Sequence, residues 1–281
     1  MITDLPPEST KQSNSKRPHK VHLTGEKATL LMPLYAKALD NRSSRSILHD
    51  EKADEIVSMI DYDFEKLKGF GNGNVMVVRA KQLDEWVKEF LGSHLNAVVL
   101  NLGCGLDARV YRINPPSTVS WFDVDFPEVI EERRNFYSNT GGYQMIASSI
   151  TKPEWLQKIP KDRSAFMIAD GVLEYLTEEQ VKELLNRITS YFPRGQIAFD
   201  IMNSYAVRMG KGRLKERTGA EHKWAVDDVN EVDRLDPKLR RVANLPLLGS
   251  KYLPLKNRLL FGVALILPRY KNMMRLLRYE F

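Results

Sequence analysis

The sequence predicts an α/β fold, in which helices cover both faces of a mainly parallel sheet and further helices precede it. Between residues 97 and 200, short apolar runs alternate with amphipathic stretches, which is typical of βαβ units. From Gly25 to about Gly92, apolar residues recur instead with helical spacing. A chain of 281 residues is long enough for one domain of this kind with additional elements.

The N-terminal part is expected to contain a disordered tail and three helices. Residues 1–20 are rich in Pro, Ser, Lys and Asn, so they bury too little apolar surface to offset their ordering entropy. The first helix is predicted over residues 26–40, and Asp50 can cap the second. The third is predicted over residues 75–90, after turn residues at 69–74.

The central part is expected to supply the strands. Five apolar runs are predicted to be buried strands, at residues 97–102, 119–124, 144–147, 165–169 and 196–200. One helix is expected to begin near Pro127. Another is expected from Thr177, which stands in capping-box spacing to Gln180.

The last third of the chain is less regular. Residues 203–250 contain few apolar runs and are expected to form helices and loops over the sheet edge. Residues 255–275 are apolar and basic, and they predict a helix that is bent or ended at Pro268. Residues 276–281 alternate in polarity, so we expect a final edge strand there.

The composition narrows the class of protein. A hydrophobic fraction of 43% and a charged fraction of 28% are ordinary for a soluble globular protein. The net charge of +6 is explained by a solvated surface with a basic tail. The single cysteine, Cys104, cannot form an intrachain disulfide. The first residues lack the apolar core of a signal peptide, and the apolar run 259–267 is too short for a membrane span. A cytoplasmic enzyme is therefore expected.

A glycine-rich turn follows the first predicted strand. Gly103, Gly105 and Ala108 fit the pattern G-x-G-x-x-A, the dinucleotide fingerprint. Glycine lets the chain turn tightly and lets a ligand approach the backbone, because it has no Cβ. Open parallel sheets bind their ligands at the carboxyl ends of the strands. The motif therefore predicts that Gly103 and Gly105 bind a nucleotide-like cofactor.

The second predicted strand ends in acids. Alternation along a strand places Asp123 and Asp125 on one face and Val124 on the other. An acid about 20 residues beyond the glycines can bind the hydroxyls of an adenosine ribose, and we favour Asp125 for this role. The alternative is that one of the acids caps the following helix. These features fit a nicotinamide cofactor as well, but the long helical segment before the glycines favours S-adenosylmethionine.

Three separated segments carry a resemblance to a known family. They read NLGCGLDAR at 101–109, WFDVDFP at 121–127 and DGVLEYL at 170–176. Together with VHLTGEKAT at 21–29 and LLRY at 276–279, they resemble the leucine carboxyl methyltransferase superfamily, in its branch similar to the tetracenomycin polyketide O-methyltransferase. The resemblance extends from about residue 20 to the end.

This resemblance implies a Rossmann-like class I methyltransferase sheet, with S-adenosylmethionine as cofactor and S-adenosylhomocysteine as product. It implies O-methylation of a carboxyl or hydroxyl group on a small, polyketide-like molecule. We expect one domain over residues 21–281. Its parts are N-terminal helices at 21–93, a cofactor-binding core at 94–201, a cap or substrate region at 202–250, and a C-terminal helix and strand at 251–281.

The resemblance also implies cofactor contacts. Arg79 is expected to hold the methionine carboxylate, since a guanidinium can bind a carboxylate through two parallel hydrogen bonds. Asp170 stands where the family usually has Glu and is expected to reach the amino group. Lys27 matches a second cation for the carboxylate.

At the adenosine end, the backbone of Gly103 is expected to meet the cofactor, and Asp125 is expected to bind the ribose. Ser149 and Ile150 match a pair beside the adenine, with Ser149 in place of the usual Asp. A serine hydroxyl can still reach the adenine amino group, although more weakly than a carboxylate.

Candidates for acid–base catalysis are few. A carboxylate acceptor needs no base, whereas a hydroxyl acceptor gains from one. His222 could be that base or an exposed loop histidine, and Tyr175 could orient the acceptor or fill the wall of the pocket. Trp224, Tyr205 and Met209 could line the substrate pocket or pack in the core. The sequence has no H-E-x-x-H motif and no Cys/His cluster, so no metal is expected.

Three alternatives remain open from the sequence. An NAD(P)-dependent oxidoreductase would use the same glycine motif. A basic nucleic-acid-binding methyltransferase is suggested by Lys11, Lys16, Arg17 and Lys20, but the tail lacks the stacking aromatics of such a surface, so no nucleic-acid partner is expected. A methyltransferase-like fold without activity would explain the departures at Ser149 and Asp170. The methyl acceptor itself is not identified by the sequence.

Overall fold

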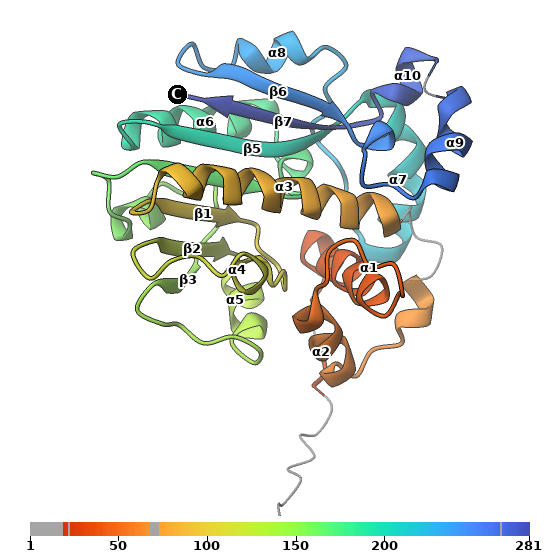
Figure 1. Ribbon diagram of the computed structural model, residues 1–281, viewed down its shortest axis with the longest axis horizontal. Coiled ribbons are helices and arrows are strands. Elements are labelled where there is room, and N and C mark those ends of the chain that lie inside the picture. The colour runs from red at the N-terminus through yellow and green to blue at the C-terminus, as the bar shows by residue number, and fades with distance from the viewer. Residues whose placement is uncertain (1–18, 22, 68–72, 265) are drawn as a thin grey trace, which may run out of the picture.

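The computed structural model describes residues 19–21, 23–67, 73–264 and 266–281, and over these residues it contains a seven-stranded sheet (Figure 1). The strands are β1 (Val98–Leu102), β2 (Ser120–Asp125), β3 (Tyr143–Ala147), β4 (Ala165–Ala169), β5 (Gly195–Met202), β6 (Arg240–Pro246) and β7 (Met274–Glu280). Their order across the sheet is β3-β2-β1-β4-β5-β7-β6. The first five are parallel, and β7 runs antiparallel to both of its neighbours.

Helices precede and connect the strands. The longer ones are α1 (Leu31–Asn41), α2 (Glu51–Met59), α3 (Gly73–Ser93), α6 (Glu178–Tyr191), α7 (Ser204–Thr218) and α9 (Leu255–Ala264). The shorter ones are α4 (Arg109–Ile113), α5 (Pro127–Arg133), α8 (Val229–Asp233) and α10 (Pro268–Lys271). Short 3₁₀ helices are η1 (Gly25–Leu30), η2 (Phe64–Leu67), η3 (Glu154–Lys158), η4 (Leu173–Tyr175) and η5 (Leu247–Gly249).

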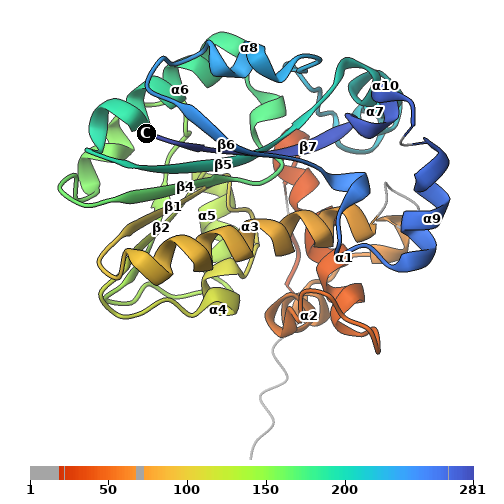
Figure 2. The same ribbon diagram turned by 45° about the horizontal axis from the view of Figure 1, so that its top comes forward.

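The sheet separates two apolar cores. Side chains alternate along a strand, so Val99 of β1 faces one core while Val98 and Leu100 face the other. The first core is closed by α1 to α5, and the second by α6 and α8. In Figures 1 and 2, α3 runs along one face of the sheet, and α7, α9 and α10 gather near the carboxyl ends of the parallel strands.

The predicted helix starts are confirmed where the sequence carries a cap. Asp50 accepts a hydrogen bond from the Ala53 amide at 2.9 Å at the start of α2. Thr177 and Gln180 form the reciprocal capping box of α6, with distances of 2.9 and 3.3 Å. The expected helix over 26–40 begins as the 3₁₀ helix η1 and only then becomes α1.

Three predictions for the C-terminal third differ from the structure. Residues 240–246 form the edge strand β6 instead of a loop, and their charged, half-exposed sequence hides the strand pattern. The final strand β7 is not an edge strand, because it is hydrogen-bonded between β5 and β6, with Leu276 and Leu277 fully buried. The helix predicted over residues 255–275, bent or ended at Pro268, is instead two helices: α9 ends at Ala264, and Pro268 begins α10.

The disordered tail predicted over residues 1–20 does not include His19. His19 pairs with the chain at Ile60, and its imidazole Nε2 lies 2.5 Å from a carboxylate oxygen of Glu132. Residues 1–18, with Lys11, Lys16 and Arg17, lie outside the described residues, as does most of the predicted turn at 69–74. None of the helices in the described ranges has the length and apolar character needed to cross a membrane.

Candidate active site

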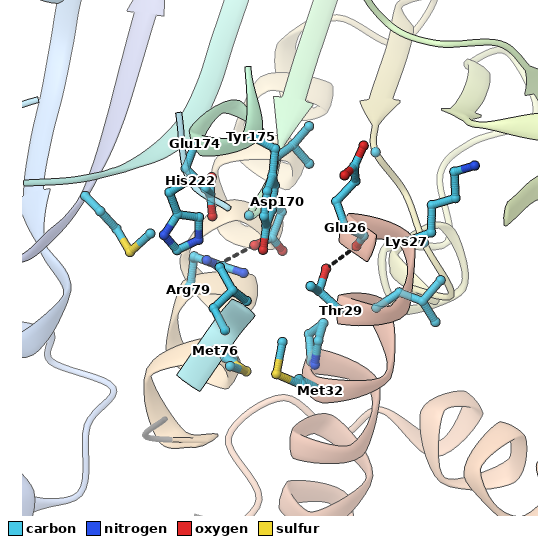
Figure 3. A pocket seen from close by; sticks show the side chains of 18 of the residues that line it. Glu26, Lys27, Thr29, Met32, Met76, Arg79, Asp170, Glu174, Tyr175 and His222 are labelled. Atoms are coloured by element: carbon cyan, nitrogen blue, oxygen red, sulfur yellow. Dashed lines mark hydrogen bonds and ion pairs between the residues drawn. The ribbon is translucent and has the colours of Figure 1, made fainter. Parts of the chain in front are cut away.

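A cavity of about 640 Å³ opens where β1, β2, β4 and β5 end (Figure 3). This volume lies within the range of about 300–1,000 Å³ that is usual for small-molecule sites. The cavity brings together the predicted site residues Lys27, Arg79, Gly103, Gly105, Asp125, Ser149, Ile150, Asp170, Tyr175 and His222. Met209 also lines it, whereas Trp224 packs in the core behind α6, and Tyr205 packs against Tyr270.

The turn after β1 requires glycine at positions 103 and 105. Gly103 and Gly105 have φ angles of +60° and +50°, a region that other residues rarely adopt. A Cβ on Gly103 would lie 2.4 Å from a methyl carbon of Val172. The Gly103 amide donates to the carbonyl oxygen of Val124 at 2.8 Å, which fixes the turn to β2. The turn therefore presents bare backbone to the cavity.

Asp125 ends β2 and faces this turn. Its two carboxylate oxygens accept hydrogen bonds from the Gly105 and Phe126 amides at 2.8 and 2.7 Å. Burial raises the pKa of Asp125 to about 6, and these two hydrogen bonds limit the rise. An ionised carboxylate with two amide partners keeps free lone pairs, so it can accept hydrogen bonds from ribose hydroxyls. Neither acid of β2 caps the next helix, since the N-cap residue of α5 is Phe126.

A buried ion pair supports the glycine turn from behind. Arg133 of α5 and Asp123 of β2 are fully buried, with a guanidinium nitrogen 2.5 Å from a carboxylate oxygen. Arg133 also donates to the carbonyl oxygens of Gly105 and Asp107, at 2.9 and 2.8 Å. The hydroxyl of Tyr143 donates to Asp123 at 2.7 Å. No sequence motif indicated this pair, although it fixes the backbone of the glycine turn.

Arg79 projects from α3 toward the ends of β4 and β5. Its Nε lies 2.5 Å from Asp170, and its Nη1 donates to Asp200 at 2.7 Å. Asp170 is held a second time by Arg109, at 2.7 Å. Burial raises the pKa of Asp170, but the two arginines outweigh burial and bring it to about 2. Arg79 Nη2 lies against Gly171, where a Cβ would be 2.6 Å away.

Three lysines line the cavity, Lys27, Lys37 and Lys223, and only Lys27 was predicted as a site residue. The ammonium of Lys27 pairs with Glu128 at 2.8 Å and points away from Arg79 (Figure 3), so its role as a second partner of the cofactor's carboxylate stays a prediction. Lys37 of α1 is buried and pairs with Asp107 at 2.9 Å. At the opposite end of the cavity, the Ser149 hydroxyl bonds to the Thr151 hydroxyl at 2.8 Å.

His222 and Tyr175 lie side by side on the β4–β5 side of the cavity (Figure 3). Their ring centroids are 5.1 Å apart. His222 is not an exposed loop residue: its Nδ1 is buried and has no hydrogen-bond partner among the described residues. Burial lowers the pKa of His222, so its imidazole is neutral at pH 7 and can accept a proton. Burial also raises the pKa of the Tyr175 phenol, which stays protonated.

Glu174 is the functional candidate that the sequence analysis missed. Its side chain lines the cavity, only 6% of the residue is exposed, and Oε2 has no hydrogen-bond partner among the described residues. Burial and the neighbouring Asp200 raise the pKa of Glu174 to about 8. The resemblance had covered this position within DGVLEYL, but nothing in the motif distinguished it from its neighbours.

The rest of the lining is apolar and adaptable. Six of the ten methionines of the chain contribute to it: Met32, Met76, Met202, Met209, Met273 and Met274. Methionine side chains are flexible and polarizable, so they fit ligands of irregular shape. Across the described ranges, there is no group of three or more His, Cys, Asp or Glu side chains that could hold a metal ion.

This arrangement defines a class of protein. A parallel sheet with a glycine turn after β1 and an acid at the end of β2 is the cofactor-binding part of a Rossmann-like class I methyltransferase. The chain belongs to the leucine carboxyl methyltransferase family, whose model matches residues 27–189. It is an S-adenosylmethionine-dependent methyltransferase, which decides the choice between the two cofactors that the glycine motif left open.

Relatives and solved structures support this assignment. The chain is 38% identical over 267 residues to the tetracenomycin polyketide synthesis O-methyltransferase of Streptomyces glaucescens, which covers 93% of this chain and 98% of that one. It is 29% identical to an S-adenosyl-L-methionine-dependent methyltransferase of Gibberella zeae, over 79% of this chain and 82% of that one. A DUF574 family protein of Streptomyces avermitilis shares the fold, with a TM-score of 0.59, 10% identity and coverage of 91% and 97%.

The cavity fits the cofactor that the family uses. Gly103 lines the cavity without a side chain, at a φ of +60° and packed against Val172 where no Cβ would fit, and Asp125 offers an ionised carboxylate beside that turn. Arg79 lines the cavity with a guanidinium whose Nη1 donates to Asp200, and Glu174 Oε2 has no hydrogen-bond partner among the described residues. These groups can meet the ribose, the carboxylate and the ammonium of S-adenosylmethionine.

Proposed function

We propose that this enzyme transfers a methyl group to an oxygen of a small, apolar, polyketide-like molecule. The observation that carries this proposal is the methionine-rich lining of the cavity next to Arg79 and Glu174. Apolar walls with a few polar groups are typical of sites for small organic ligands. The named activity of the Streptomyces glaucescens relative, an O-methyltransferase of polyketide synthesis, supports the same substrate class.

The strand order gives each end of the cavity a role. Asp125, Ser149 and Ile150 follow β2 and β3 and are proposed to hold the adenosine. Gly103 and Arg79 lie toward β1 and β4 and are proposed to hold the methionine part. When bound there, S-adenosylmethionine supplies an activated methyl group. The protein then has mainly to orient the acceptor oxygen, which can account for about 7–11 kcal/mol of the barrier.

The acceptor is proposed to enter between the N-terminal helices and the segment 202–250. Met32 and Met76 come from the helices, and Met202, Met209 and His222 come from the other side. This arrangement supports the proposed division of residues 21–281 into helices, cofactor-binding core, cap and C-terminal helix and strand. We also propose a cytoplasmic enzyme, because the single cysteine, Cys104, fits a reducing compartment.

His222 is proposed to accept the proton of a hydroxyl acceptor, with Tyr175 orienting the same oxygen. The neutral imidazole has a buried, unpartnered Nδ1 in the cavity, where a substrate hydroxyl could donate to it. A carboxylate acceptor is already ionised, so it would use the same cavity without the base. Hydroxyl and carboxylate acceptors therefore predict different effects of a His222 variant on kcat.

We expect His222→Ala to lower kcat about 10²–10⁴-fold for hydroxyl acceptors and to leave carboxylate acceptors unaffected. The assay is formation of S-adenosylhomocysteine with a panel of polycyclic phenols and aromatic carboxylic acids. His94→Ala is the matched control, because His94 stacks on Phe90 outside the cavity. A hydroxyl acceptor whose kcat falls less than tenfold would exclude His222 as the base. Absence of transfer to the whole panel, with cofactor binding intact, would contradict the proposed substrate class.

A further inference from the structure

The methionine end of the cavity contains more acids than cations. Three carboxyl groups, those of Asp170, Asp200 and Glu174, surround the guanidinium of Arg79. Asp170 and Asp200 each lie within 2.7 Å of an Arg79 nitrogen. Asp170 is bound by Arg109 as well. Glu174 is the acid of this group without an arginine at contact distance.

Glu174 is buried, yet one of its oxygens is free. The groups that face it come from every element packed around it: Arg79 from α3, Asp170 from the end of β4, Asp200 from β5 and Tyr175 beside it in η4. The segment after α7 adds the half-buried imidazole of His222, while the backbone amide of residue 223 donates to the Glu174 carbonyl oxygen. Burial and the negative charge of Asp200 disfavour the ionised carboxylate more than Arg79 favours it, so Glu174 retains its proton.

Asp170 cannot easily take a further cation. Its Oδ2 accepts a hydrogen bond from Arg109 at 2.7 Å, and its Oδ1 faces Arg79 at 2.5 Å. Oδ1 has no hydrogen-bond partner among the described residues, as is true of Glu174 Oε2, but both oxygens of Asp170 are already paired with a guanidinium, which disfavours for Asp170 the role that the resemblance gave it, binding of the cofactor's amino group. Glu174 Oε2 is buried, unpartnered and part of the cavity wall. Figure 3 shows the Glu174 carboxyl above Arg79, on the same side of the cavity as Asp170.

We propose that Glu174, rather than Asp170, binds the ammonium group of the cofactor's methionine part, and that Glu174 releases its proton to the solvent as this cation arrives. The proposal rests on the proposed placement of the cofactor in this cavity. The proton leaves the carboxyl oxygen, and the resulting carboxylate pairs with the ammonium. The three acids then face three cations, Arg79, Arg109 and the ammonium, instead of two.

Proton release is the measurable consequence. Because the pKa of Glu174 is about 8, the Glu174 carboxyl carries its proton in about 90% of the enzyme molecules at pH 7. Binding of S-adenosylmethionine or S-adenosylhomocysteine should release about 0.9 proton at this pH, since both carry the ammonium. By contrast, 5′-methylthioadenosine has the adenosine and the sulfur but no ammonium. It should bind without proton release.

The experiment is calorimetry at pH 7 in phosphate and in Tris, two buffers with different ionisation enthalpies. The difference between the two observed binding enthalpies, divided by the difference between the two buffer ionisation enthalpies, gives the number of protons released. We expect Glu174→Gln to abolish the release and to weaken S-adenosylhomocysteine binding at least tenfold. The amide has the shape of the protonated acid, so the variant should keep the wild-type melting temperature. Glu179→Gln is the matched control, because Glu179 is exposed at the start of α6.

The outcomes separate this proposal from the assignment of the site. Wild-type binding without proton release, or unchanged affinity in Glu174→Gln, would overturn the role of Glu174. Loss of the proton release in Asp170→Asn but not in Glu174→Gln would return the ammonium to Asp170. Failure of the wild type to bind either S-adenosylmethionine or S-adenosylhomocysteine would instead contradict the proposed cofactor site.

Discussion

Replacement of Arg133 with Met is expected to lower the free energy of unfolding by about 3–5 kcal/mol, the usual effect of breaking a buried ion pair. The substitution leaves the Asp123 carboxylate buried without its cation. It also removes the donors to the carbonyl oxygens of Gly105 and Asp107, so the glycine turn loses its support. We therefore expect loss of cofactor binding as well. Urea unfolding followed by circular dichroism measures the first effect, and calorimetry with S-adenosylhomocysteine measures the second.

Two variants control this prediction. Arg134→Met changes the exposed neighbour, and its effect on stability should stay within about 0.5 kcal/mol. The double variant Arg133→Met, Asp123→Leu should lose less stability than the sum of the single variants, because no charge is left unpaired. A loss below about 1 kcal/mol in Arg133→Met would show that the pair does not hold the turn.

Arg79→Met is expected to have a comparable effect. Without the guanidinium, Asp170 keeps Arg109, but Asp200 is left buried without a cation. We expect a loss of about 3–5 kcal/mol in the free energy of unfolding, together with loss of the contact proposed for the methionine carboxylate. Urea unfolding measures the loss of stability, and calorimetric titration with S-adenosylhomocysteine measures the loss of cofactor binding.

A variant that keeps the charge separates binding from folding. Arg79→Lys retains the cation but not the planar fork, so it should fold and still bind S-adenosylhomocysteine at least tenfold more weakly. Gly171→Ala should act similarly, because its Cβ would lie 2.6 Å from Arg79 Nη2 and its φ is +73°. Lys81→Met, on the exposed side of the same helix, is the control. Wild-type affinity in Arg79→Lys would remove Arg79 from the cofactor site.

The fold was largely predictable because its signals are local. Apolar runs marked β1 to β5, and the side chains of Asp50 and Thr177 marked the starts of α2 and α6. The arrangement of the last strands was not predictable in the same way. The alternating pattern of β7 is compatible with either an edge or an interior position, and β6, which makes β7 interior, is too polar to be recognised as a strand.

The residues of the candidate site likewise fall into those that the sequence predicts and those that only the tertiary structure identifies. Gly103 and Asp125 were predicted because the ends of parallel strands meet at one edge of a sheet, and Asp170 was predicted from the family resemblance. Glu174 was not found, since its character depends on burial and on the absence of a partner, and both arise only in the tertiary structure. The partner of Arg133 lies ten residues away in a different element, so no sequence spacing indicates the pair.

The most direct test of the account is calorimetric titration of the wild-type protein and of Asp125→Ala with S-adenosylmethionine and S-adenosylhomocysteine, with nicotinamide cofactors tested alongside. A hydrogen bond to a charged group contributes about 1.5–3 kcal/mol, so the variant should bind both ligands at least tenfold more weakly. Wild-type affinity should also fall below pH 6, where Asp125 becomes protonated. Micromolar binding that shows both effects would confirm the site. Equal affinity in Asp125→Ala, or binding of nicotinamide cofactors alone, would contradict it.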